Sequence, residues 1–173
     1  KINDLLSTTQ APQQHYENLH IGRKKLFSPV TLSNTDFASH WLAVEYKHKS
    51  FEQTSIVLFT SKGERVRSKS EVIIADTLNR LGIPYRYEFP IRLKNYTVHS
   101  DFYCLNLCTR QEFAWEHFGM MDDGEYVQRV MEKQNIYAKN NWIVGKNLIF
   151  TMETRECPLN SKVIEKIALT CLC

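Results

Sequence analysis

The chain has 173 residues and a mass of 20.3 kDa, with 43% hydrophobic, 24% charged and 12% aromatic residues. This composition is that of a globular domain and excludes a wholly disordered or collagen-like chain. The net charge of +3 permits an anionic partner but is far below that of a histone-like tail. No apolar run approaches the ~18 residues that span a bilayer. The number of cysteines is five, and this odd number does not indicate a framework of disulfides. We therefore expect a cytoplasmic protein without a membrane partner and, since it begins at Lys1, part of a longer polypeptide.

The chain divides by composition near residue 54. Residues 1–54 are rich in Gln, Ser, Thr, His and Asn, which predicts an N-terminal extension of short helices and loops. Residues 55–173 contain clear start and stop signals for regular elements, so one α/β domain is expected there.

The elements of this domain follow in chain order. Residues 55–60 form a β-branched and aromatic run, typical of an edge strand. A helix over 68–81 begins at the capping box Ser68–Glu71 and ends before Gly82. The remaining pattern predicts strands over 85–91, 96–105 and 112–118, a helix over 123–140, a strand over 147–152 and a helix over 160–172.

Three carboxylates occupy positions where the pattern predicts burial. Glu71 lies near the centre of the apolar face of the first helix, at about 100° per residue; alternatively it only completes the capping box. Asp101 interrupts an aromatic and β-branched strand, unless that strand lies at an edge with one solvated face. Glu116 lies in the most hydrophobic strand, where a charge must be paired with a cation, such as an arginine, or bound to a metal.

Together these three carboxylates predict a site for a hard divalent cation. Mg²⁺, or Mn²⁺ in its place, prefers oxygen ligands and leaves room for a substrate phosphate. Such a metal activates water and stabilises charge on a scissile phosphate.

Four segments carry a resemblance to a known family. They read RVRSKSE over 65–71, IPYRYE over 83–88, SDF over 100–102 and WEHFGMMD over 115–122. Over residues 55–170 the chain resembles the PD-(D/E)XK nuclease superfamily, in an uncharacterised bacterial branch. The resemblance implies a restriction-endonuclease-like fold, with a central mixed four-stranded sheet flanked by helices in the order αβββαβ. It also implies an Mg²⁺-dependent deoxyribonuclease of DNA processing, repair or defence, whose metal ligands and catalytic acids are Glu71, Asp101 and Glu116.

The sequence departs from the pattern of the superfamily at two positions. Ser100 replaces the proline before Asp101, which shapes a bend but does no chemistry. Phe118 replaces the lysine expected two residues after Glu116, on the same face of the strand. The usual cation of the superfamily is therefore missing at this position.

The second helix offers a replacement for that lysine. Lys133 and Tyr137 are four residues apart, so both can face the site. The alternative for Lys133 is a solvated lysine that packs over Tyr137. Gln134 and His117 are further accessory candidates, although His117 points the other way along a regular strand and can simply be a packed histidine.

Basic residues gather immediately before the first helix and on a neighbouring strand. A nucleic-acid backbone is bound by such residues near the cleavage site, although a short charged run can also be a solvated loop. The candidates are Lys62, Arg65, Arg67, Lys69 and Arg86. We expect DNA as the partner, with RNA as an alternative, and a homodimer is one of the oligomeric states left open. The competing function is a catalytically inactive nucleic-acid-binding or scaffolding module on the same fold, and a third class is a purely structural α/β domain.

Overall fold

The computed structural model describes residues 14–26, 31–51 and 57–173. The chain divides into two compact units, Lys1–Ala43 and Val44–Cys173. The first unit contains the short helices α2 (Ile21–Lys24) and α3 (Asn34–Leu42), the latter capped by the Ser33 hydroxyl. No helix in the described ranges is both long and apolar enough to cross a membrane.

The second unit is built on a four-stranded sheet in the order β3-β6-β7-β8. The strands are β3 (Tyr85–Tyr87), β6 (Phe102–Leu105), β7 (Glu112–Phe118) and β8 (Leu148–Met152). The first three strands pair antiparallel, and β8 joins β7 in parallel. The prediction of a mixed α/β fold with a central mixed four-stranded sheet flanked by helices is confirmed.

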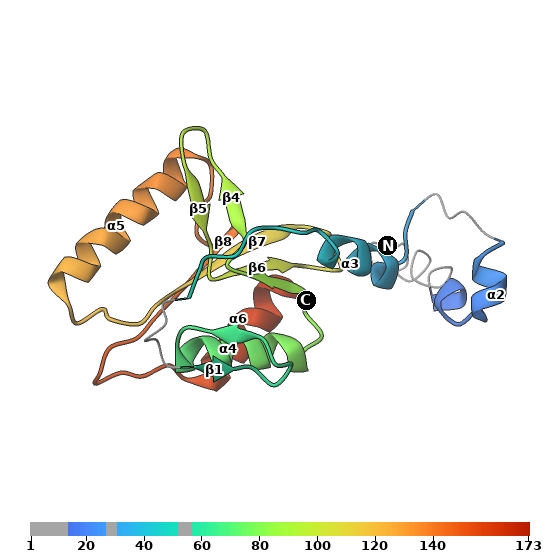
Figure 1. Cartoon of the computed structure of the whole chain (residues 1–173), viewed down its shortest axis with the longest axis horizontal. Helices are drawn as coiled ribbons and strands as arrows, with labels where there is room; N and C mark the ends of the chain where they lie inside the picture. Colours follow the sequence, from blue (N-terminus) through green and yellow to red (C-terminus); the bar gives the residue numbers. More distant parts are fainter. Residues whose placement is uncertain (1–13, 27–30, 52–56) are drawn as a thin grey trace, which may run out of the picture. The chain divides into compact units, whose positions relative to one another are not determined.

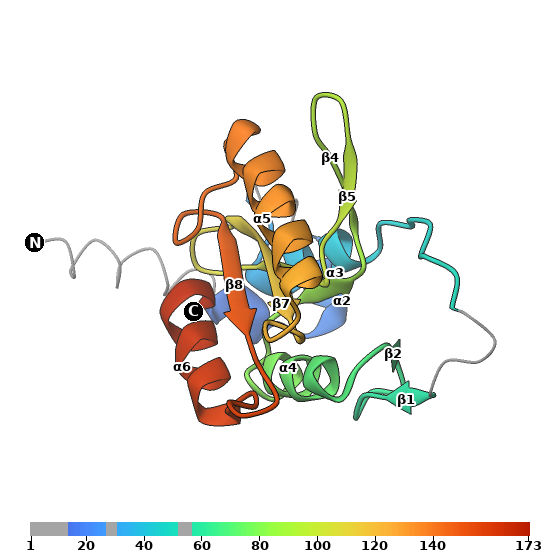
Figure 2. The same cartoon turned by 90° about the vertical axis from the view of Figure 1, so that its left-hand side faces the viewer.

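Helices cover both faces of this sheet (Figures 1 and 2). On one face lie α4 (Lys69–Arg80) and α6 (Ser161–Leu172), and on the other lies α5 (Gly124–Lys139). The apolar core lies between the sheet and the pair α4 and α6, where Ile74, Trp115 and Ile164 are fully buried. The three helices begin as predicted, because Ser68, Asp123 and Asn160 cap their first turns.

Two predicted strands are each broken into two. The run over 85–91 forms β3 and β4 (Pro90–Arg92), and the run over 96–105 forms β5 (Thr97–His99) and β6. The break lies at Glu88, whose φ of 50° turns the backbone. Hydrogen bonds from Glu88 N to Asp101 O (3.0 Å) and from Ser100 N to Phe89 O (3.3 Å) continue the pairing across the break. The β4–β5 hairpin therefore projects from the sheet on the side of α5 (Figure 1). Asp101 lies between β5 and β6, directly before the first residue of β6.

A second small hairpin precedes α4. β1 (Leu58–Phe59) pairs antiparallel with β2 (Arg65–Val66). The predicted strand over 55–60 is thus shorter, and Ser55 and Ile56 lie outside the described residues. The basic segment before α4 is part of this hairpin rather than a free loop.

Candidate active site

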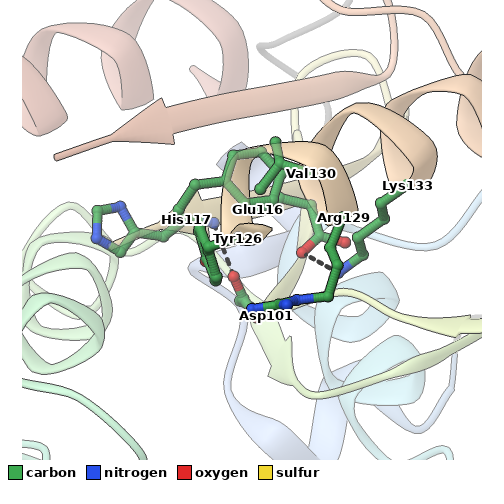
Figure 3. A pocket seen from close by; sticks show the side chains of 8 residues that line it. Asp101, Glu116, His117, Tyr126, Arg129, Val130 and Lys133 are labelled. Atoms are coloured by element: carbon green, nitrogen blue, oxygen red, sulfur yellow. Dashed lines mark hydrogen bonds and ion pairs between the residues drawn. The ribbon is translucent and has the colours of Figure 1, made fainter. Parts of the chain in front are cut away.

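A pocket of about 180 Å³ opens between the end of β7 and the first half of α5. Figure 3 shows the Glu116 and Lys133 side chains pointing toward one another and Asp101 pointing to the His117 backbone, whereas the His117 ring points away. The pocket is lined by Asp101, Glu116, His117, Phe118, Tyr126, Arg129, Val130 and Lys133. Three of the predicted catalytic residues, Asp101, Glu116 and Lys133, are therefore brought together.

Glu116 is fully buried, with 0% of its surface exposed. Lys133 Nζ donates to its Oε2 at 2.6 Å, and the Tyr137 hydroxyl donates to its Oε1 at 2.5 Å. Both donors come from α5, one turn apart, which is the spacing that predicted them. The buried charge is thus paired with a cation, as a carboxylate in an apolar strand requires, and that cation is Lys133 rather than an arginine.

Asp101 lies at the junction of the β4–β5 hairpin and β6. Its Oδ2 accepts a hydrogen bond from the His117 amide at 2.7 Å (Figure 3). Burial, and then the negative charge of Glu116, raise the pKa of Asp101 well above its ordinary value, against the opposing effects of Lys133 and the His117 amide. The two carboxylates therefore repel each other inside one pocket, which favours a cation between them.

The ammonium group of Lys133 is held in its charged form. Burial acts to lower its pKa, but the charges of Glu116 and Asp101 and the hydrogen bond to Glu116 outweigh burial, so the pKa is raised. Phe118 lines the same pocket from β7, two residues after Glu116. The cation that pairs with Glu116 therefore comes from α5.

The His117 side chain lies on the opposite face of the sheet from Glu116, as strand alternation requires. Its ring lies within hydrogen-bonding distance of Thr151 Oγ1 and Glu153 Oε1, both at 3.1 Å. The hydroxyl of Ser70 on α4 also donates to Glu153. His117 therefore contributes its backbone to the pocket, and its side chain ties β7 to β8 and α4.

Glu71 lies outside the residues that line the pocket. Its Oε2 accepts hydrogen bonds from the Tyr87 hydroxyl (2.7 Å) and from the Arg67 amide (2.8 Å). Its own amide donates to Ser68 Oγ, which is one half of the predicted capping box. Glu71 is close enough to contribute to the raised pKa of Asp101, as the smallest of its causes.

The residues predicted to contact nucleic acid differ in how exposed they are. Lys62, Lys69 and Arg67 are exposed and Arg65 is half-buried. Arg67 makes a bidentate ion pair with the buried Glu88, at 2.7 and 3.1 Å. Arg86 is only 6% exposed and lies over the ring of Phe89, so the fold withdraws it from a phosphate backbone. Gln134 is exposed on α5 and does not line the pocket.

Asp101 and Glu116 are the two carboxylates of the pocket that could hold a hard divalent cation. Asp101 Oδ1 makes no hydrogen bond within the described ranges, and Mg²⁺ is commonly held by one or two carboxylates with water and substrate phosphate completing its shell. A cluster of three or more His, Cys, Asp or Glu residues placed to hold a metal is absent from the part of the chain that the structure describes. Of the three predicted ligands, Asp101 and Glu116 line the pocket and Glu71 does not.

Two pocket residues were missed from the sequence, Tyr126 and Arg129. Arg129 lies one helical turn before Lys133, so the spacing that identified Lys133 and Tyr137 also indicates Arg129. Glu153 was missed as well, because it follows β8 and no local pattern connects it with His117.

Comparison with known proteins gives a limited result. No family model matches the chain, and no solved structure matches it significantly. An uncharacterized protein of Methanocaldococcus jannaschii, MJ1519, is 31% identical over 123 residues. The match covers 64% of this chain and 10% of the relative, so the chain spans about a tenth of that protein's length.

Proposed function

We propose that residues 44–173 form a divalent-metal-dependent nuclease domain that hydrolyses phosphodiester bonds of DNA, within a longer protein. The observation that carries the proposal is the convergence of Asp101, Glu116 and Lys133 in one pocket. Two carboxylates and a buried, charged lysine are the groups that metal-assisted phosphodiester hydrolysis needs. The αβββαβ element order and the mixed sheet support a restriction-endonuclease-like fold for the domain.

Each pocket residue has a role in this proposal. Asp101 and Glu116 would hold the metal, which when bound supplies a Lewis acid and lowers the pKa of water. The His117 amide orients Asp101, and the Tyr137 hydroxyl orients Glu116. Lys133 presents a fixed positive charge where negative charge develops on the phosphate oxygens, and a preorganised charge of this kind costs no rearrangement during the reaction.

The second candidate is an inactive nucleic-acid-binding module on the same fold. It is favoured by Phe118, which occupies the usual lysine position, and by the close pairing of Lys133 with Glu116. In that case the lysine would serve only to neutralise a buried carboxylate. The two candidates differ in hydrolysis and agree on DNA binding.

Cleavage assays separate the two candidates. The full chain is incubated with supercoiled plasmid and with end-labelled single-stranded DNA, in Mg²⁺, in Mn²⁺ and in EDTA. We expect metal-dependent cleavage by the wild type, none by Asp101→Asn, and a loss of roughly two to three orders of magnitude in rate for Lys133→Met. The matched control is Asp122→Asn, which removes an exposed carboxylate outside the pocket.

Metal binding is measured on the same variants by thermal unfolding. A ligand that binds only the folded state raises the unfolding midpoint, so Mn²⁺ should raise it for the wild type and Asp122→Asn but not for Asp101→Asn. Cleavage that is equal in the wild type and Asp101→Asn would exclude the nuclease proposal. DNA binding without cleavage in either metal would favour the inactive module.

A further inference from the structure

Arg129 is an exposed cation on the pocket wall. It lies on α5 one turn before Lys133 and lines the pocket together with Asp101 and Glu116. Within residues 14–26, 31–51 and 57–173 its guanidinium makes no hydrogen bond or ion pair. Its charged group lies 5.7 Å from the centre of the Tyr126 ring, in a cation–π arrangement.

The second cation of the pocket, Lys133, already pairs with a carboxylate of the protein. Lys133 Nζ lies 2.6 Å from Glu116 Oε2, so one of its hydrogen bonds is already made to a fully buried carboxylate. Arg129, by contrast, keeps its donors available at the solvent side. The pocket thus combines an internal ion pair with an exposed guanidinium on its wall.

Tyr126 fixes the place of this guanidinium. It lies in the first turn of α5, half-buried, and its amide donates a hydrogen bond to Asp123 Oδ1 at 3.0 Å. A half-buried ring beside the guanidinium limits the conformations open to the arginine. Less entropy is then lost when the arginine orders around a ligand.

We propose that Arg129, supported by Tyr126, is a phosphate-binding residue of this pocket and contacts a non-bridging oxygen of a nucleic-acid backbone. The identity of the ligand rests on the proposed nuclease function, whereas the anion site rests on the placement of Arg129. A planar guanidinium suits this ligand because it can donate two parallel hydrogen bonds to the oxygens of one phosphate. Arg129 therefore selects the backbone and not a particular base.

The test measures DNA binding separately from cleavage. The affinity of the full chain for a fluorescein-labelled single-stranded oligonucleotide is measured by anisotropy in EDTA, over a series of salt concentrations. The variants are Arg129→Gln and Arg129→Lys, and Lys139→Gln is the control. That control removes an exposed charge from the same helix outside the pocket.

We expect Arg129→Gln to raise Kd roughly tenfold. It should also reduce the steepness of the plot of log K against log salt by about 0.7, the value for one phosphate contact on a single strand. Arg129→Lys should keep the slope and recover part of the affinity, because it retains the charge and loses the fork. Lys139→Gln should leave the slope at the wild-type value.

An unchanged slope in Arg129→Gln, an equal change in Lys139→Gln, or a wild type that does not bind the oligonucleotide would each overturn the inference. The outcome for the nuclease proposal is read independently from cleavage by the wild type. Cleavage with an unchanged slope in Arg129→Gln overturns only the phosphate site. A reduced slope without cleavage supports the phosphate site and leaves hydrolysis unsupported.

Discussion

Glu116 is the residue on which the site depends, because a fully buried carboxylate is stable only when both oxygens have donors. Lys133 and Tyr137 provide one donor each, from consecutive turns of α5. Burial and the charge of Glu116 raise the pKa of the Tyr137 hydroxyl, so this group stays protonated and remains a donor. Tyr137 is thus a positioning residue, because its removal takes a hydrogen bond from the Glu116 carboxylate and no contact from a substrate.

Replacing Tyr137 by phenylalanine should therefore destabilise the protein. The change leaves Oε1 of Glu116 buried without its hydrogen bond, and an orphaned buried group of this kind costs about 1–3 kcal/mol. Urea unfolding followed by tryptophan fluorescence measures the loss. The control, Tyr96→Phe, alters a tyrosine that is 56% exposed and should stay within about 0.5 kcal/mol of the wild type. Equal stability of Tyr137→Phe and the wild type would mean that Oε1 is not held by this hydroxyl.

At the scale of elements, Glu153 links three parts of the fold behind the pocket. It follows β8, accepts a hydrogen bond from the Ser70 hydroxyl on α4 and another from the Leu159 amide before α6, and lies against the His117 ring. Burial acts to raise the pKa of Glu153, but the hydrogen bonds from Ser70, Leu159 and His117 outweigh it and hold the pKa below its ordinary value. The carboxylate therefore favours the folded state in its ionised form.

Glu153→Gln should lower the free energy of unfolding at pH 7, by about 1–2 kcal/mol if the amide keeps part of the network. Because the pKa of Glu153 is lower in the folded protein, the unfolded chain binds more protons between the folded and unfolded pKa values. The contribution of Glu153 to the free energy of unfolding is therefore fully present above the unfolded pKa of 4.5. It is lost as the pH falls through the lower, folded value. Urea midpoints of the two proteins should converge as the pH falls through the folded value of the Glu153 pKa.

The control for this pH series is Glu156→Gln, an exposed carboxylate on the same connection between β8 and α6. It should leave the urea midpoint unchanged at every pH. A difference between the wild type and Glu153→Gln that persists undiminished at low pH would contradict a role for the ionised carboxylate. An effect of that kind would come from packing alone.

The helices could be predicted closely from the sequence and the strands less so. Ser68, Asp123 and Asn160 signal helix starts locally, through side chains that bond to the backbone a few residues on. The breaks that create β4 and β5 have no such signal, because the alternation of residues 85–91 continues unchanged through Glu88. A glutamate with positive φ is held there by tertiary contacts, among them its ion pair with Arg67.

The same distinction applies to the site. Asp101 and Glu116 were visible because each interrupts an apolar strand, and Lys133 because helical spacing places it beside Tyr137. Glu71 was predicted as a third ligand beside them, because helical periodicity places it on the inward face of α4. The structure shows that Tyr87 and the Arg67 amide occupy its carboxylate instead, a contact between distant segments that no local pattern contains.

At the scale of the whole molecule, the boundary between the two units lies after Ala43, earlier than the change in composition near residue 54 suggests. Two aromatic residues explain why the segment of residues 44–51 belongs to the second unit. The Tyr46 hydroxyl donates to the Tyr87 carbonyl oxygen at 2.8 Å and its ring packs edge-on against Phe89. The guanidinium groups of Arg65 and Arg67 lie 4.3 and 4.5 Å from the centre of the Phe51 ring.

Two truncations test this boundary. A chain that begins at Val44 keeps these contacts, and we expect it to fold cooperatively with metal-dependent cleavage equal to that of the full chain. A chain that begins at Ser55 loses both aromatic residues and should be less stable than the first by roughly 2–4 kcal/mol, from lost apolar burial and cation–π contacts. Phe51→Ala in the full chain measures the share of this stability loss that comes from the Phe51 ring, because it removes the ring and leaves Tyr46 in place. Equal urea midpoints for the two truncations would instead put the boundary near residue 55, where composition alone suggests it.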